Sequence, residues 1–210
     1  MADMFEKLVK LPTEPVAKIL ARQQVLLKTR LDCEVSATAS VVLKELYSKK
    51  AMIDMLRLMG ILLPPRERVW WACLAARDYI GPRSPKDPPS LRTSEAWVLE
   101  PSEENRQAAR ITIDHAYVDD DTVNCAWAVT YHDGTLGPGD LRQYPAPAGA
   151  AEAAAFAMNM VALGQLSDKF EEHGYLLIER ALDIARGGNG RVGAQDAAAA
   201  EPADIGADQS

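Results

Sequence analysis

The run ILLPPRERVWWACLAAR, residues 61–77, combines a proline pair, a cluster of charges and two adjacent tryptophans. Pro64 and Pro65 cannot lie inside a helix, but Pro65 can occupy its first position, where no backbone N–H is needed. The apolar spacing that follows predicts a helix that ends near Gly81. The large side chains of this helix make it the starting point for the fold.

The tryptophan pair has two interpretations. Neighbouring helical positions differ by about 100°, so Trp70 and Trp71 cannot both face the same way. One interpretation is an interaction site flanked by arginines, since Trp and Arg dominate interface energetics. The alternative places both rings in the core with their N–H groups hydrogen-bonded and an arginine paired with an acid. The residues predicted for interaction are Arg66, Glu67, Arg68, Trp70 and Trp71.

Length and charge limit the function classes. A chain of 210 residues fits one domain or two small ones. The net charge of −7 argues against nucleic-acid binding, which needs a cationic surface, and against an electrostatic membrane anchor. We therefore expect a protein partner that is basic or presents a helix, and the sequence leaves homo-oligomer formation open.

Cysteine usage and the absence of targeting patterns indicate the compartment. The three cysteines are far apart and form no CxxC motif, which favours a reducing environment without disulfides. The N-terminus lacks the pattern of a signal peptide. No apolar run reaches the roughly 18 residues of a membrane helix, so we expect no membrane insertion and a cytoplasmic protein.

Helical periodicity runs through most of the chain and predicts a mostly α-helical fold. A helix over about 101–117 is expected to have Ser102 as its N-cap. Residues 122–131 stay ambiguous because they also alternate like a strand. The other predicted helices are 13–31, a segment around 41–46, Ala51–Gly60, the helix from Pro65, an Ala-rich stretch within 146–166, and 168–186.

The expected architecture is an irregular multi-helix bundle or a helical-repeat-like stack. We expect a single helical domain over residues 1–186. Residues 81–94, with four prolines, are predicted to form an extended loop inside it. Residues 187–210, rich in Gly, Ala and Asp, are predicted to form a disordered acidic tail.

Motifs that would carry chemistry are weak. Cys73, His115 and His132 could belong to a small enzyme site with carboxylates, but they are far apart in sequence and form no known signature. The acidic run at 117–121 lacks the alternation of a calcium loop and is better explained as a solvated turn and helix cap. The sequence therefore predicts no catalytic residue, no metal site and no cofactor.

One segment resembles a known family. The run Pro-x-Arg-Glu-x-x-Trp-Trp-Ala-Cys, at 64–73, is similar to the signature of an uncharacterised family of bacterial proteins, and the resemblance is strongest over about 60–130. It implies a bacterial cytosolic origin and an association with protein-secretion and signalling machinery, and it implies nothing about catalysis.

Together these features predict a non-enzymatic protein–protein interaction module, such as an adaptor, chaperone or accessory subunit of a bacterial secretion or assembly system. In that hypothesis an apolar helix stripe is buried against the partner, with Arg66 and Arg68 supplying directional hydrogen bonds. The alternatives are a small enzyme with a His, Cys and carboxylate site, and a structural subunit of a homo-oligomer.

Overall fold

The computed structural model describes residues 4–192 and confirms the mostly α-helical fold. These residues contain nine α-helices, two short 3₁₀ helices and no strand, with one isolated antiparallel bridge between Thr135 and Pro145. The helices are α1 (Val16–Arg22), α2 (Ala39–Ser48), α3 (Met52–Leu62), α4 (Pro65–Ile80), α5 (Pro89–Leu99), α6 (Glu103–Asp114), α7 (Val123–Thr130), η1 (Gly139–Gln143), α8 (Ala150–Gln165), η2 (Ser167–Lys169) and α9 (Phe170–Arg186).

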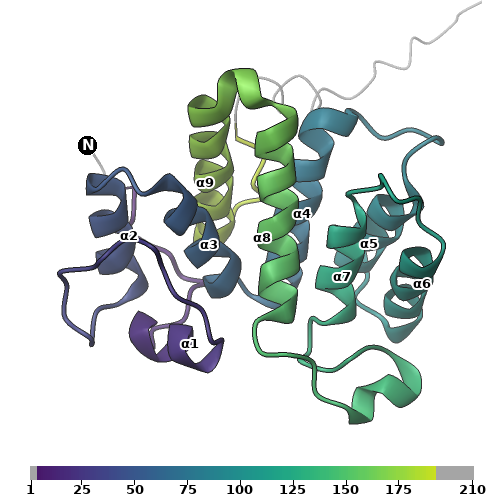
Figure 1. The fold of residues 1–210 in the computed structure, drawn as a ribbon, viewed down its shortest axis with the longest axis horizontal. Coiled ribbons are helices and arrows are strands. Elements are labelled where there is room, and N and C mark those ends of the chain that lie inside the picture. Colours follow the sequence, from purple (N-terminus) through teal and green to yellow (C-terminus); the bar gives the residue numbers. More distant parts are fainter. Residues whose placement is uncertain (1–3, 193–210) are drawn as a thin grey trace, which may run out of the picture.

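The helices form an irregular bundle around a central group. Figure 1 shows α4, α8 and α9 in the middle of the molecule, with α1–α3 on one side and α5–α7 on the other. Helix α8 packs against α3, α4 and α7, and therefore bridges the two sides. Small side chains on α8, such as those of Ala151, Ala155 and Ala162, are buried and allow this close packing.

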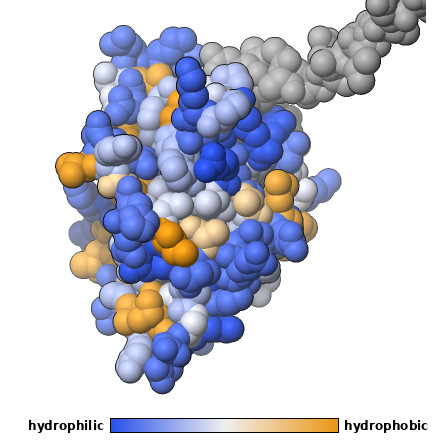
Figure 2. Space-filling view, turned by 90° about the vertical axis from the view of Figure 1, so that its right-hand side faces the viewer, coloured by the Kyte–Doolittle hydropathy of each residue, from blue (hydrophilic) through white to orange (hydrophobic). Residues whose placement is uncertain are grey.

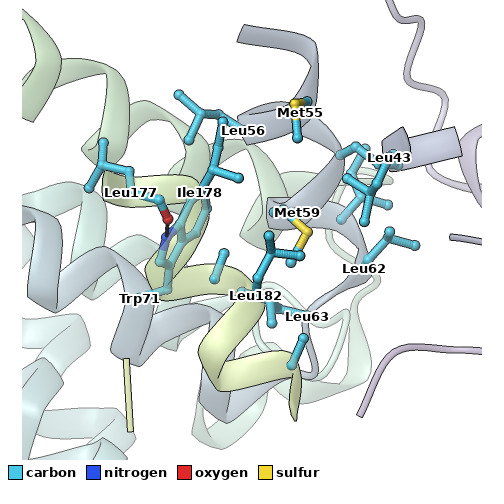
Figure 3. Close-up of a cluster of buried hydrophobic side chains, with 14 of the residues drawn as sticks. Leu43, Met55, Leu56, Met59, Leu62, Leu63, Trp71, Leu177, Ile178 and Leu182 are labelled. Atoms are coloured by element: carbon cyan, nitrogen blue, oxygen red, sulfur yellow. Dashed lines mark hydrogen bonds between the residues drawn. The ribbon is translucent and has the colours of Figure 1, made fainter. Parts of the chain in front are cut away.

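Two clusters of buried apolar side chains meet at α4. Trp71 belongs to the first cluster, with residues of α2, α3 and α9, and Figure 3 shows this cluster in close-up. Val69 and Cys73 belong to the second, with residues of α5, α7 and α8. The side chains of Trp70 and Tyr79 pack against both clusters. Helix α4 therefore joins the two parts of the core.

The predicted helix over 13–31 is wrong in its second half. Helix α1 ends at Arg22, because Gln24 takes a left-handed conformation with φ of 54°. The N–H of Val25 then bonds back to the carbonyl oxygen of Leu20 at 3.0 Å, which closes the helix end.

Carboxylates from later helices hold the irregular chain that follows α1. Asp54 of α3 accepts hydrogen bonds from the N–H groups of Lys28, at 3.1 Å, and Thr29, at 2.6 Å. Glu45 of α2 accepts the N–H of Cys33 at 2.9 Å. These partners satisfy backbone groups that a helix would otherwise satisfy, so tertiary contacts override the helical spacing.

The predicted extended loop over 81–94 is wrong from Pro89 onward. Pro89 occupies the first position of α5, as Pro65 does in α4. Leu91 and Trp97 of α5 are buried in the second core cluster. The four prolines therefore mark a short connection and a helix start, and the apolar residues after them are core.

The region 122–131, left open between helix and strand, is the helix α7. Its residues Cys125, Ala126 and Val129 are completely buried, because α7 packs against α4, α5, α6 and α8. The predicted N-cap of the preceding helix is confirmed, since the Ser102 hydroxyl accepts the N–H of Asn105 at 3.2 Å.

The predicted tail over 187–210 begins too early, because the chain directly after α9 still contacts the helices. Gly187 ends α9 in a left-handed conformation with φ of 103°. The N–H of Gly190 then donates to the Asp183 carboxylate at 2.9 Å, so the chain folds back onto the helices. The rest of the predicted tail, 193–210, lies outside the described residues.

Candidate functional site

The five residues predicted for interaction all lie in the first two turns of α4, which begins at Pro65. Their side chains leave the helix in different directions, because successive positions differ by about 100°. The structure therefore brings them together along the chain but points them at different neighbouring segments. Each of the five ties α4 to at least one of those segments.

Arg68 is buried and closes the end of α3. Its guanidinium donates to the carbonyl oxygens of Gly60, at 2.6 Å, and Leu63, at 2.9 Å. Its Nη2 also lies 2.9 Å from the Glu152 carboxylate of α8. Burial lowers the pKa of Arg68, while the Glu152 charge acts in the opposite direction. Gly60, which we expected to end the preceding helix, lies inside α3 beside α8.

Trp71 is completely buried and joins α4 to α9. Its indole N–H donates to the carbonyl oxygen of Leu177 at 2.9 Å. Figure 3 shows this bond as a dashed line, with the ring beside Leu177 and Ile178. This is the arrangement described by the core interpretation of the sequence.

Trp70 is only partly buried and holds the chain segment that follows α9. Its indole N–H donates to the carbonyl oxygen of Asn189 at 2.7 Å. The guanidinium of Arg191 lies over the same ring, 6.0 Å from its centroid. Because the ring keeps some exposure, it joins the end of the described chain to α4 and also reaches the surface.

Arg66 and Glu67 bind two further segments. The exposed Arg66 donates from Nε to the carbonyl oxygen of Val98 at 2.6 Å, near the end of α5. Glu67 accepts a hydrogen bond from the ammonium group of Lys10 at 2.8 Å, which ties the N-terminal segment to α4. Arg66, Glu67 and Trp70 thus retain surface that a partner could contact, whereas Arg68 and Trp71 are internal.

Cys73 is enclosed and is not placed beside an imidazole. Burial raises the pKa of the Cys73 thiol well above its usual value, and the neighbouring Cys125 thiol acts in the same direction. The other groups that act on it are Glu95 and Arg77, and neither imidazole proposed from the sequence is among them. Cys73 is therefore held in the protonated form, which is a poor nucleophile.

The two histidines considered with Cys73 have other surroundings. His132 packs at a tilt against Trp97, with ring centroids 4.7 Å apart and 51° between the ring planes, and its Nδ1 lies 2.9 Å from the carbonyl oxygen of Val129. Burial lowers the pKa of His132. His115 is exposed at the end of α6. Among residues 4–192, no group of three His, Cys, Asp or Glu side chains is arranged to hold a metal ion.

The sequence analysis missed a buried polar cluster between α4 and α9. Arg180 donates from Nη1 to both carboxylate oxygens of Asp78, at 2.7 and 2.6 Å. The Nε2 atom of His173 lies 3.2 Å from the same carboxylate. Burial lowers the pKa of His173, and Asp78 partly offsets this. The available signal was a His and an Arg seven positions apart on the buried stripe of α9.

A second missed cluster fixes the connection between α4 and α5. Arg77 binds both carboxylate oxygens of Glu95 at 2.8 Å and lies 2.7 Å from Asp87. These carboxylates raise the pKa of Arg77, and the Arg77 charge lowers the pKa of Asp87. The cluster explains why the chain before Pro89 is ordered.

A different surface combines exposed apolar side chains with carboxylates. We call residues 100–124 the α6 edge: it contains α6, the loop that follows it and the start of α7. Ile111, Tyr117 and Val118 are exposed there. The segment contains seven carboxylates and two arginines, hence a formal net charge of −5. The other described residues contain 18 acids and 21 bases, hence +3.

The structure is that of an all-helical domain built around one central helix, α4, whose side chains bind the segments that surround it. The chain belongs to a family of unknown function, DUF6931, whose model matches residues 42–185. That range runs from α2 to the last turn of α9. Comparison with curated proteins and with solved structures gave no match. No helix in the described part of the chain is long and apolar enough to cross a membrane.

Proposed function

We propose that this protein is a non-enzymatic protein–protein interaction module. The observation that supports the proposal is the fixation of α4: Arg66, Arg68, Trp70 and Trp71 each donate a hydrogen bond to the backbone of another segment. The side chains that sequence analysis singled out thus organise the helices. A domain fixed in this way presents a preorganised surface, which lowers the entropic cost of binding a partner.

The positions of the ionisable groups also favour binding over catalysis. Cys73 lies inside the helix packing, and Arg77 and Arg180 are engaged by carboxylates. Polar groups engaged in this way hold helices together, and they have little freedom to bind a small substrate. Arg66, Glu67 and Trp70, which keep exposed surface, are the part of the predicted interaction site that we propose for partner contact.

A narrower form of the proposal is a cytoplasmic adaptor, chaperone or accessory subunit of a bacterial secretion or assembly system. Support for that narrower role comes from the resemblance of the run at 64–73. The broader proposal does not depend on it.

Affinity capture with matched variants tests the broader proposal. Tagged wild-type chain is compared with Arg66→Ala and Trp70→Ala in lysate of a bacterium that carries the gene. The control is Glu171→Gln with Glu172→Gln, two exposed changes on α9. Arg68 and Trp71 are left intact because changing a buried side chain would report on folding.

The proposal predicts a protein enriched by the wild type and by the control but reduced for at least one of the two variants, with all four chains folded by thermal unfolding. Light scattering on the purified chain accompanies the capture. A stable oligomer without any other enriched protein would replace the proposal with the homo-oligomer alternative. An absence of both enrichment and oligomer would refute it.

A further inference from the structure

Helix α6 is an edge helix. It packs against α5 and α7, and its inner side carries the buried side chains of Arg106 and Ala109. The positions one turn apart on the other side, Glu104, Gln107 and Ile111, are exposed. Figure 1 shows α6 at the border of the molecule, on the side away from α1–α3. Arg142 of η1 lies 3.6 Å from Glu103 at the start of α6, whereas the stripe formed by Glu104, Gln107 and Ile111 stays exposed.

Exposed apolar side chains follow this face into the loop. Ile111 is 47% exposed, Tyr117 is 85% exposed, and Val118 is fully exposed. Figure 2, which faces this side of the molecule, shows apolar patches that are small and separated by hydrophilic surface. Separate apolar side chains are common on protein surfaces, and where such a surface binds a partner a few side chains carry most of the binding energy.

The turn that carries these anchors is held in a defined conformation. The carbonyl oxygen of Tyr117 accepts the N–H of Asp120 at 3.0 Å, which places Val118 and Asp119 at the tip of a turn. The Asp120 carboxylate in turn accepts the N–H of Thr122 at 3.0 Å. Because the backbone is already ordered, little conformational entropy is lost when Tyr117 and Val118 are covered.

The charge of the α6 edge identifies the kind of partner. Its net formal charge of −5 contrasts with the +3 of the other described residues. Asp119 is exposed at the tip of the turn beside Val118, and Glu104 is exposed on the outer face of α6. A surface of this sign attracts cationic segments and repels acidic ones.

We propose that the α6 edge binds a cationic segment of a partner protein, with Tyr117 and Val118 as apolar anchors and the carboxylates as the surrounding rim. This inference rests on the proposed function, because it names the surface and the chemistry of the partner for the same interaction module. It adds a second contact region to the partly exposed residues of α4.

Photo-crosslinking at Tyr117 tests both the location of the binding surface and the charge of the partner segment. Benzoylphenylalanine replaces Tyr117, an exposed aromatic position, and in a matched control it replaces Phe170, which is exposed at the start of α9. Cells that carry the gene are irradiated, and the crosslinked segment is identified by mass spectrometry. We expect an adduct at Tyr117, absent at Phe170, in which the partner segment has a net positive charge.

The crosslinked segment is then made as a synthetic peptide and its binding to the purified chain is measured by fluorescence anisotropy. We expect Asp119→Asn with Asp121→Asn to weaken binding about tenfold at about 50 mM salt and less at about 300 mM, because salt screens exposed charges. Val118→Ser should weaken binding about tenfold at both concentrations, since an apolar contact is not screened. The matched control, Glu171→Gln with Glu172→Gln, should change binding less than about twofold.

Several results would overturn the inference: no adduct at Tyr117, an adduct with a neutral or acidic segment, or an adduct only with a second copy of this chain. Its failure is distinguishable from failure of the proposed function. A chain carrying both Tyr117→Ser and Val118→Ser is compared with Arg66→Ala and Trp70→Ala. If it still captures the partner that either of those variants loses, the α6 edge is not the binding site, but the protein is still an interaction module. If the wild type captures nothing, the proposed function itself is wrong.

Discussion

Trp71 and Leu177, which are 106 positions apart in the sequence, are joined by a hydrogen bond of 2.9 Å from the indole N–H to the carbonyl oxygen. Trp70, the neighbour of Trp71, donates its own N–H to Asn189, 119 positions away. The two adjacent indoles therefore connect α4 to the body of α9 and to the segment after it. The first bond is fully enclosed, and the second lies at the surface.

This difference in burial predicts unequal effects of the same substitution. Trp71→Phe should lower the free energy of unfolding by about 2–4 kcal/mol, because it removes a buried hydrogen bond and leaves a cavity. Trp70→Phe should cost about 1 kcal/mol, since water can replace part of the lost contact. Urea unfolding followed by circular dichroism measures both values. Equal losses for the two variants would contradict the assignment of Trp71 to the core.

The pair formed by Arg68 and Glu152 leads to a second prediction. Arg68→Ala should destabilise the protein by about 3–5 kcal/mol, because it leaves the largely buried Glu152 carboxylate and the end of α3 without their donor. Arg66→Ala, two positions earlier and exposed, is the matched control and should cost about 1 kcal/mol. A double-mutant cycle with Glu152→Ala should give a coupling energy of about 1–3 kcal/mol, as expected for residues in direct contact. Additive losses would show that the 2.9 Å contact contributes no stability.

Local signals were sufficient for two helix starts, those of α4 and α6, and for one geometric property of α4. Pro65 at the first helical position and Ser102 as an N-cap depend on backbone groups within one turn, and both are confirmed. The divergence of Trp70 and Trp71 also follows from helix geometry alone. Which of the two rings enters the core depends on α9, so the sequence left two interpretations.

The errors arise where distant residues satisfy the backbone. Residues 23–31 were predicted to continue a helix, yet Asp54 of the later helix α3 accepts the N–H groups of Lys28 and Thr29. Pro89 was assigned to a loop although it obeys the rule applied to Pro65, because the neighbouring prolines masked the helix start. The paired state of Arg77 depends on carboxylates 10 and 18 positions away, Asp87 and Glu95.

The three cysteines should differ sharply in reactivity. Cys33 is partly exposed, whereas Cys73 and Cys125 are completely buried. Burial and the Glu45 carboxylate raise the pKa of Cys33, so its reaction with a thiol reagent should speed up at alkaline pH. We expect one thiol to react in the native protein and two more after unfolding in guanidinium chloride. In a Cys33→Ser chain the native reaction should vanish, and a second fast thiol would contradict the buried positions.

The buried His173 and the partly buried His132 predict that the protein loses stability in mild acid. Burial lowers the pKa of both His132 and His173 below the ordinary value of 6.5. As the pH falls through that value, the unfolded chain binds protons that the folded protein does not, so the free energy of unfolding decreases. The contribution is fully present above pH 6.5 and is lost progressively below it, until the folded imidazoles also take up protons.

Urea unfolding at several pH values between about 5 and 7 measures this slope, in a window above the ordinary pKa of carboxylates. Lowered carboxyl pKa values, such as those of Asp87 and Asp133, act in the same direction but only at lower pH. The chain carrying both His132→Gln and His173→Gln should have a flatter slope than the wild type, whatever its absolute stability. Tyr144→Phe, a substitution at an exposed position, is the control and should leave the slope unchanged. If the double variant keeps the wild-type slope, groups other than these two imidazoles control the acid response. The burial of His173 beside Asp78 would then not affect how the free energy of unfolding depends on pH.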